Sequence, residues 1–114
     1  MRFNYRLWIE NERGEYVLGE GSFLILKEIQ KTGSLSKAAR NLEMSYSYVW
    51  RKIKKIERRT GFKIVESFRG GRKKGETHLT EYGKSLLSLY ERVDKKIRDL
   101  KIEEKISTNE RNFR

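Results

Sequence analysis

SLSKAARNLEMSYSYVWRKIKKIERR, residues 34–59, has the pattern of a short helix, a tight turn and a longer helix. Ala38 and Ala39 are small enough to let the two helices cross closely, and Leu42 and Met44 are expected to fill the turn. Ser45 suits the start of the longer helix, because its hydroxyl can accept a hydrogen bond from a free N–H of the first turn. This order of features predicts a helix-turn-helix.

The longer helix has two contrasting faces. Val49, Ile53 and Ile56 recur at helical spacing, which predicts a buried stripe. The opposite face is polar and basic, and holds Ser47, Tyr48, Arg51, Lys54, Lys55 and Arg58. Residues 51–59 contain six cations and one acid, Glu57, so like charges repel each other along the helix. Because a polyanion would relieve this repulsion, the pattern favours binding of nucleic acid over a solvated surface without a function.

The composition of the whole chain agrees with a small binding protein. Its 114 residues suit one domain, expected over residues 1–106 and followed by a polar tail at 107–114. The formal charge of +11 favours a polyanionic partner, with DNA, RNA and anionic lipid all compatible. No apolar run reaches the ~20 residues of a membrane span, and no signal-peptide pattern begins the chain. The expectation is a cytoplasmic protein that does not contact membranes.

The segments before the turn predict a hairpin and a first helix. Apolar and polar side chains alternate over residues 3–9, which predicts a half-buried strand, and residues 15–18 are expected to pair with it within the first 18 residues. Residues 22–31 have the apolar spacing of a helix, and Gly33 is expected to end it. Three helices are therefore expected within residues 22–60.

Residues 62–79 follow the longer helix and predict two strands joined by a glycine-rich loop. The loop, residues 69–76, carries four cations: Arg69, Arg72, Lys73 and Lys74. A hairpin in this position is the wing of a winged helix, and such a basic wing is expected to contact the flanking backbone or the minor groove of DNA.

A long final helix is expected over residues 80–106, with Thr80 as its N-cap. Apolar residues step by four and three positions, as in a coiled-coil seam, at Leu86, Tyr90, Val93, Ile97 and Leu100. A helix of about 25 residues spans roughly 37 Å, more than so small a domain can cover. We therefore expect the seam to form a dimer interface, the alternative being that it packs on its own domain.

These elements predict a mainly α protein with small β hairpins: a winged helix-turn-helix with an N-terminal β-hairpin and a long C-terminal dimerisation helix. Catalytic features are not predicted. His78 is the only histidine, cysteine is absent, and no glycine-rich phosphate-binding motif occurs. No catalytic, cofactor or metal residue is therefore assigned, and the chain is expected not to be an enzyme.

Two longer strings carry a resemblance to a known family. GSLSKAARNLEMSYSYVWRKIKKIE at 33–57 and FKIVESFRGGRKKGETHLTEYGKSLLSLYE at 62–91 resemble the N-terminal DNA-binding domain of ModE-type, molybdate-responsive transcription regulators. That family belongs to the wider LysR-like winged-helix group. The resemblance covers roughly residues 20–93. Its most specific marks are Ser45-Tyr46 followed by Trp50, the glycines at 70–75, and Leu79-Thr80 followed by Tyr82-Gly83.

The resemblance implies a homodimeric repressor or activator that binds an inverted-repeat operator in double-stranded DNA. One departure matters. Full-length regulators of this type carry C-terminal oxyanion-binding domains, whereas this sequence ends at Arg114 without residues that could form them. A molybdate-binding domain, molybdate sensing and a cofactor are therefore not expected in this chain, and two alternatives stay open: a stand-alone regulator, or a regulator that responds to a different effector.

The recognition helix, residues 45–59, carries most of the predicted DNA contacts. Arg51 is the best candidate to read guanine, because it faces outward and can donate two parallel hydrogen bonds. Packing is favoured for Tyr46, and packing or a thymine contact for Trp50. Lys52, Lys55 and Arg58 are expected on phosphates. The full set is Ser45, Tyr46, Ser47, Tyr48, Trp50, Arg51, Lys52, Lys54, Lys55 and Arg58, with Ser34 and Ser36 at the start of the second helix.

Three functions compete at this point. The leading one is a sequence-specific, dimeric transcription regulator of double-stranded DNA. The second is a non-specific architectural or chromatin protein with the same fold, which the high positive charge also favours. The third is a winged helix that binds RNA or protein, for which aromatic side chains on a sheet are expected; Tyr5 and Trp8 leave this open.

Overall fold

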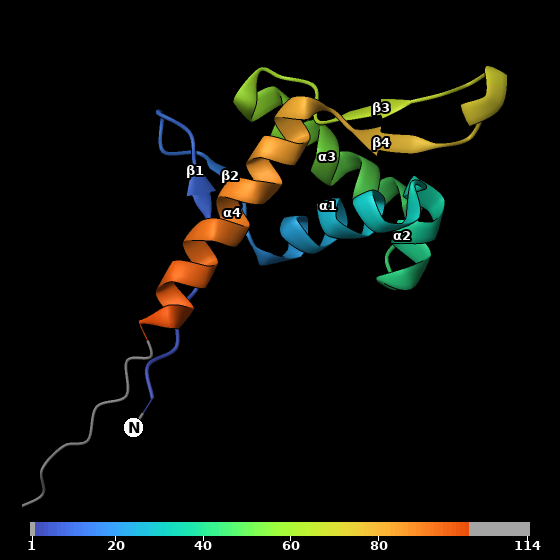
Figure 1. Cartoon of the computed structure of the whole chain (residues 1–114). Coiled ribbons are helices and arrows are strands. Elements are labelled where there is room, and N and C mark those ends of the chain that lie inside the picture. Colours follow the sequence, from blue (N-terminus) through green and yellow to red (C-terminus); the bar gives the residue numbers. More distant parts are fainter. Residues whose placement is uncertain (1, 101–114) are drawn as a thin grey trace, which may run out of the picture.

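The computed structural model describes residues 2–100, and Figure 1 shows their arrangement. A β-hairpin is followed by three helices, a second hairpin and a last helix. The bounds are β1 Ile9–Glu10, β2 Tyr16–Leu18, α1 Glu20–Thr32, α2 Leu35–Asn41, α3 Tyr46–Thr60, β3 Val65–Ser67, β4 Thr77–Leu79 and α4 Glu81–Asp99, with a short 3-10 turn at Gly71–Lys73. The predicted fold class, a mainly helical winged helix-turn-helix with small hairpins, is confirmed.

The core lies between α1, α2 and α3. Leu26 and Ile29 of α1, Ala38 of α2 and Val49 and Ile53 of α3 are all completely buried. Ala38 is small enough to let α2 cross close to its neighbours, as the sequence predicted. The three-residue stripe of Val49, Ile53 and Ile56 is buried as a unit, so the inward face of α3 is the predicted one.

The turn between α2 and α3 is held by backbone and side chains together. Leu42 and Met44 are partly buried against the core, and the Met44 N–H donates to the Ala39 carbonyl at 2.9 Å. Glu43 adopts a left-handed φ of 56°, which lets the chain reverse between the helices. The predicted role of Leu42 and Met44 in this turn is confirmed.

Side-chain caps set the helix starts. Ser34, Ser45 and Thr80 accept hydrogen bonds from the N–H groups of Lys37, Tyr48 and Gly83, and therefore cap α2, α3 and α4. Of the two serines considered for α2, Ser34 is the cap, while Ser36 lies exposed in the first turn. Gly33 ends α1 in the left-handed conformation, as predicted. The helix itself begins two residues earlier than predicted, at Glu20.

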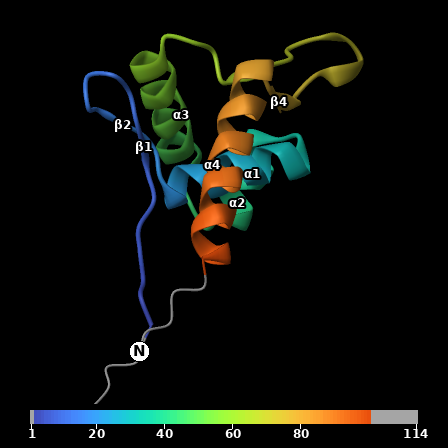
Figure 2. The same ribbon diagram turned by 60° about the vertical axis from the view of Figure 1, so that its left-hand side comes forward.

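The second hairpin forms the wing, and it is shorter than predicted. β3 and β4 pair antiparallel with Val65 opposite Leu79 and Ser67 opposite Thr77. Figures 1 and 2 show the loop projecting beyond the helical body. Phe62 was predicted to begin the first strand, but its ring is exposed and stacks on Tyr82 with 4.4 Å between ring centroids.

The N-terminal segment differs most from the prediction. Only Ile9–Glu10 forms a strand, which pairs with β2, whereas residues 3–8 lie outside any strand. The alternating pattern corresponds to burial only at Leu7 and Ile9, which pack partly buried against the core, whereas Phe3 and Tyr5 are exposed. These residues run beside α4 instead (Figure 2): the Tyr5 hydroxyl donates to Asp94 Oδ1 at 2.7 Å. The predicted strand over residues 3–9 is therefore wrong for most of its length.

The last helix starts where predicted and packs across α1. Residues 101–106, part of the predicted helix, and the predicted tail 107–114 lie outside the described residues. Leu86 and Tyr90 are buried within the chain at 7% and 5% exposure, and the Tyr90 ring stacks on Phe23. These two residues have little surface left for a partner, so the first half of the predicted seam packs on its own domain.

Val93 and Leu100, in the second half of that seam, are exposed, and Ile97 is half-buried.

Within residues 2–100, none of the helices combines the length and apolar character that a membrane crossing requires.

Candidate nucleic-acid interface

The outward face of α3 is open along its whole length. Arg51, Lys55 and Arg58 lie on the side opposite the buried stripe and are not covered by the core. A groove of about 610 Å³ lies on this face between Tyr48, Trp50 and these three cations. The structure therefore brings together the cations that the sequence predicted for the recognition helix.

The first turn of α3 presents aromatic and hydroxyl groups. Tyr46, for which packing was favoured, is 53% exposed, so that prediction is wrong. Its ring projects from the first turn, ahead of the first residue of the buried stripe. Tyr48 is also exposed, and Ser47 lies 3.4 Å from Ser45 through their hydroxyl oxygens. Ser45 itself is occupied as the N-cap, which gives it a structural role.

Trp50 and Lys54 form one unit. The Lys54 ammonium lies 4.3 Å from the centroid of the Trp50 ring and 2.9 Å from Glu57 Oε1. Trp50 remains partly exposed, so one ring face meets a cation while other parts meet solvent. Lys54 is less free than the other predicted contacts because its charge already has a partner.

Glu57, the only acid of the recognition helix, is turned toward the protein. Its Oε2 accepts a hydrogen bond from the Ile64 N–H at 2.9 Å, just before the wing begins. Burial raises the pKa of Glu57, but the Ile64 N–H and the Lys54 ammonium outweigh it and hold the pKa below its ordinary value. Glu57 thus remains ionised near neutral pH without placing negative charge on the outward face.

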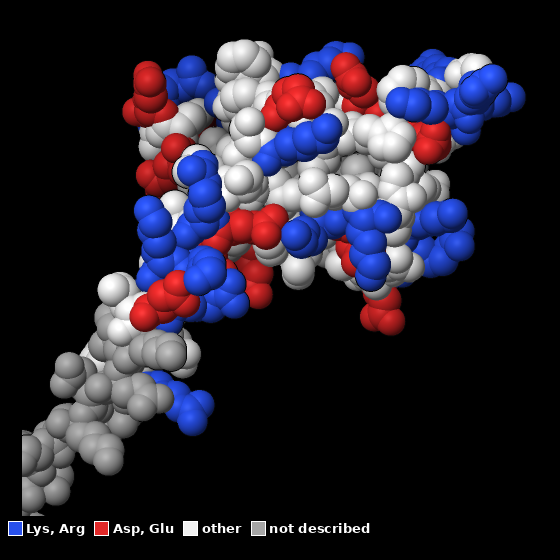
Figure 3. Space-filling model, viewed as in Figure 1, with Lys and Arg blue, Asp and Glu red and all other residues white. Residues whose placement is uncertain are grey.

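Four exposed cations surround the tip of the wing. Arg69, Arg72, Lys73 and Lys74 are all exposed, and Figure 3 shows blue side chains gathered at the end of the second hairpin. Lys73 lies 5.2 Å from the centroid of the Phe68 ring, which orients its ammonium. The loop is built on a 3-10 turn, with Gly71 and Gly75 at positive φ. The wing is therefore a second, separate cationic surface.

His78, the one histidine of the sequence, lies in strand β4 of the wing. His78 Nε2 lies 3.5 Å from Glu76 Oε1, with the ring edge-on to Phe68 at 5.7 Å between centroids. Among residues 2–100, no three His, Cys, Asp or Glu side chains gather as metal ligands.

Several curated regulators are similar in sequence to this chain. The transcriptional regulator ModE of Haemophilus influenzae is 35% identical over 71 residues, which cover 62% of this chain and 28% of that protein. The Yersinia pestis ModE is 39% identical over 67 residues, which cover 59% of this chain and 26% of that protein. The Escherichia coli K12 relative is a DNA-binding transcriptional dual regulator. It is 34% identical over 67 residues, which cover 59% of this chain and 26% of that protein. The chain thus spans about a quarter of the length of the curated relatives it matches.

Solved structures show the same fold. The crystal structure of the CbnR_DBD–DNA complex superposes with a TM-score of 0.57 at 18% identity, covering 69% of this chain and 85% of that one. The BenM_DBD/benA site 1 DNA complex gives a TM-score of 0.55 at 19% identity, covering 70% of this chain and 87% of that one.

The profile of the bacterial regulatory helix-turn-helix proteins of the lysR family matches residues 22–84, more than half of the chain. That family consists of regulators, not of enzymes. The ModE relatives confirm the resemblance seen in the sequence. The chain therefore belongs to the lysR family of bacterial regulatory helix-turn-helix proteins, and part of it is similar in sequence to ModE regulators.

Proposed function

We propose that this chain is a transcription regulator that binds double-stranded DNA at specific sequences as a homodimer in the cytoplasm. One observation carries the proposal: Arg51, Lys55 and Arg58 are exposed on the outward face of α3 and form no ion pair with an acid among residues 2–100, and Glu57 is turned inward. An exposed basic helix preceded by a tight turn matches the way in which recognition helices enter the major groove. The DNA complexes of structurally similar domains support this use of the fold.

The contacts divide by their place on α3. Arg51 lies mid-helix on the outward face, where a guanidinium can pair with guanine O6 and N7. Tyr46 and Ser47 in the first turn, with Trp50, are placed to meet base edges or thymine methyl groups. Lys52, Lys55 and Arg58 follow toward the end of the helix and would neutralise phosphates. Ser36, exposed at the start of α2, would contact the backbone, while Ser34 serves as the cap.

The wing supplies the second contact. Arg69, Arg72, Lys73 and Lys74 would meet the phosphate backbone beside the major-groove site. Four flexible cations on a projecting hairpin add affinity without reading sequence, because phosphates are the same at every base pair.

The second half of α4 is the proposed dimer surface. Val93 and Leu100 are exposed, and Leu89 lies on the same flank of the helix. Together with the half-buried Ile97 they form an apolar stripe, of which Leu89, Val93 and Leu100 are left exposed by the described part of the chain. Burial of such a stripe against a second copy would remove apolar surface from water. The interface proposed from the sequence is thus kept for Val93, Ile97 and Leu100.

The alternative is a non-specific architectural DNA-binding protein, which the charge of +11 also favours. Selection of bound duplexes from a random pool distinguishes the two functions. A specific dimer yields an inverted repeat with half-sites about one or two helical turns apart. A pool without enriched sequence would support the architectural function.

A further inference from the structure

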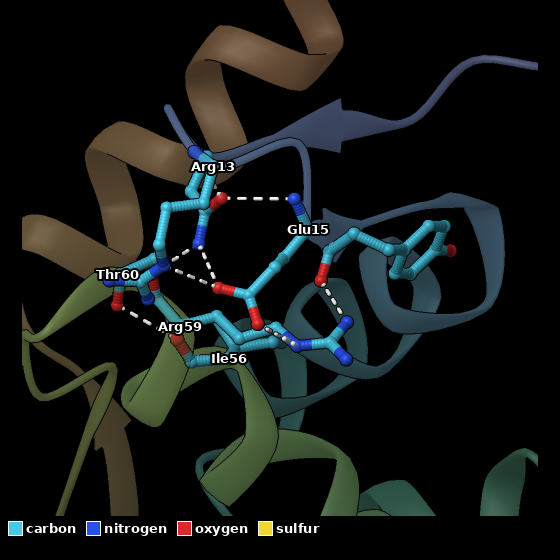
Figure 4. A network of polar contacts seen from close by, with 7 residues as sticks. Arg13, Glu15, Ile56, Arg59 and Thr60 are labelled. Carbon is cyan, nitrogen blue, oxygen red and sulfur yellow. Dashed lines mark hydrogen bonds and ion pairs between the residues drawn. The ribbon is translucent and has the colours of Figure 1, made fainter.

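The turn of the first hairpin rests on the C-terminal end of the recognition helix (Figure 4). The Asn11 side-chain amide donates one hydrogen bond to the Arg59 carbonyl at 3.0 Å and another to Glu15 Oε1 at 3.0 Å. Its oxygen accepts from the N–H groups of Arg13 and Glu15. All four bonding positions of the amide are used. Asn11 therefore ties the hairpin to one of the last carbonyls of α3, which a helix cannot satisfy by itself.

Arg59 is held by the same turn. Its guanidinium donates to the Tyr16 carbonyl, and its Nε lies 4.0 Å from Glu15 Oε2 (Figure 4). Its side chain is 26% exposed and points to the hairpin, whereas Arg51, Lys55 and Arg58 line the outward groove. Arg59 is thus withdrawn from the basic face and anchors the helix.

The same N-terminal segment is attached to α4 at its other end. The Tyr5 hydroxyl donates to Asp94, and the Leu7 carbonyl accepts from the Tyr90 hydroxyl at 3.1 Å. Residues 5–16 therefore connect the proposed dimer helix with the end of the recognition helix. They also precede residues 22–84, the part that the family profile matches.

We propose that residues 5–16 are a brace that fixes the orientation of the recognition helix, with Asn11 as the positioning residue. This inference rests on the proposed function. Lys55 and Arg58 lie in the last two turns of α3, and a helix end frays when its carbonyls are unpaired. A fixed end keeps these cations in register with Arg51 before DNA arrives, so less ordering is needed on binding.

The sharpest test is Asn11→Asp. This change keeps the oxygen that accepts from the hairpin backbone and removes the donor to Arg59. It also removes the hydrogen bond from the Asn11 amide to Glu15 Oε1 and sets a new charge beside that carboxylate. Asn4→Asp is the matched control, since Asn4 is exposed just before the brace and gains the same charge.

Hydrogen exchange and DNA binding are then measured on both variants of the full chain. In Asn11→Asp we expect amides 57–61 to exchange about tenfold faster, while α1 and α2 keep their protection. We expect affinity for the selected duplex to fall about tenfold more than affinity for random duplex, because poor orientation affects base contacts most. Asn4→Asp should show neither effect.

Two results would overturn the brace. Unchanged exchange at 57–61 would show that Asn11 does not hold the helix end. An equal loss of affinity on selected and random duplexes would reduce the hairpin to a stabiliser of the fold. If the unaltered chain binds all duplexes alike, the proposed function fails by itself, and the exchange of amides 57–61 alone decides whether the brace exists.

Discussion

Glu57 shows how one acid organises a basic helix. It neutralises Lys54, binds the Ile64 N–H and leaves the outward face to the cations. In the sequence, Glu57 stands only as the single acid among the six cations of residues 51–59. The contact with Ile64 joins residues seven apart in the chain, one of them beyond the end of α3, so helical periodicity gave no sign of it.

Arg51 is the residue whose replacement tests base reading. Arg51→Ala should weaken binding to the selected duplex by about 1–3 kcal/mol and relax the preference at one base pair, because the bidentate pairing with guanine is removed. Binding to duplexes altered at each position in turn measures this. Equal weakening on every duplex would assign Arg51 to the backbone instead.

The lowered pKa of Glu57 predicts that the stability of the fold depends on pH. Because the pKa of Glu57 in the folded chain lies below its ordinary value of 4.5, ionised Glu57 stabilises the fold above that value, and the contribution is lost as the pH falls through the lowered pKa. Glu57→Gln should therefore cost about 1–2 kcal/mol near neutral pH. Urea unfolding from pH 7 to pH 3 should show the difference from the unaltered chain shrinking at the acid end. A constant difference would contradict the role of the charge.

At the scale of elements, local signals were the most reliable. Ser45, Thr80 and Gly33 were recognised, and the choice at α2 was narrowed to Ser34 or Ser36, because a cap depends on the residue and its immediate neighbours. The strand over residues 3–9 was wrong because alternation does not supply a neighbouring strand, and the hydroxyl of Tyr5 found a partner on α4 instead.

The junction of wing and α4 depends on one glycine. A Cβ on Gly83 would collide with the carbonyl oxygen of Ile64. Gly83→Ala should therefore destabilise the chain by about 1–3 kcal/mol, although alanine is the better helix former. Gly21→Ala is the control, because Gly21 lies in α1 with open space around it. Thermal unfolding of both variants measures the effect, and equal melting temperatures would refute this packing.

The cations of the wing predict how the affinity for DNA depends on salt concentration. Replacing Lys73 and Lys74 together by Ala should reduce the slope of log K against log salt concentration by about 0.9 for each phosphate that the wing no longer neutralises. The paired change Lys95→Ala and Lys96→Ala removes the same charge from α4. A slope that changes equally in both variants would exclude a specific role of the wing.

For the whole molecule, we expect dimer formation to depend on the apolar stripe of α4. Val93→Glu should lower the association of the chain by a factor of ten or more, roughly, because a charge would enter an apolar interface. Sedimentation equilibrium measures the monomer–dimer balance, and Ser85→Glu serves as the control because Ser85 is already exposed on the helix. A chain that is monomeric at all concentrations before the change would contradict the proposed dimer.

The sequence predicted the basic face of α3 and the cationic wing, because both follow from periodicity and local charge. It did not predict that Lys54 and Arg59 have protein partners, since these partners depend on how Glu57 turns and on the N-terminal hairpin. A heptad pattern likewise cannot tell burial in the chain's own core from burial in a partner. Leu86 and Tyr90 are buried in the chain's own core.

The most direct measurement compares the dissociation constants of the unaltered chain for a duplex selected from a random pool and for random duplex of equal length, at one salt concentration. If α3 reads base edges, the selected duplex should bind at least about 1000-fold more tightly. Equal dissociation constants for the two duplexes would contradict sequence-specific recognition by this helix.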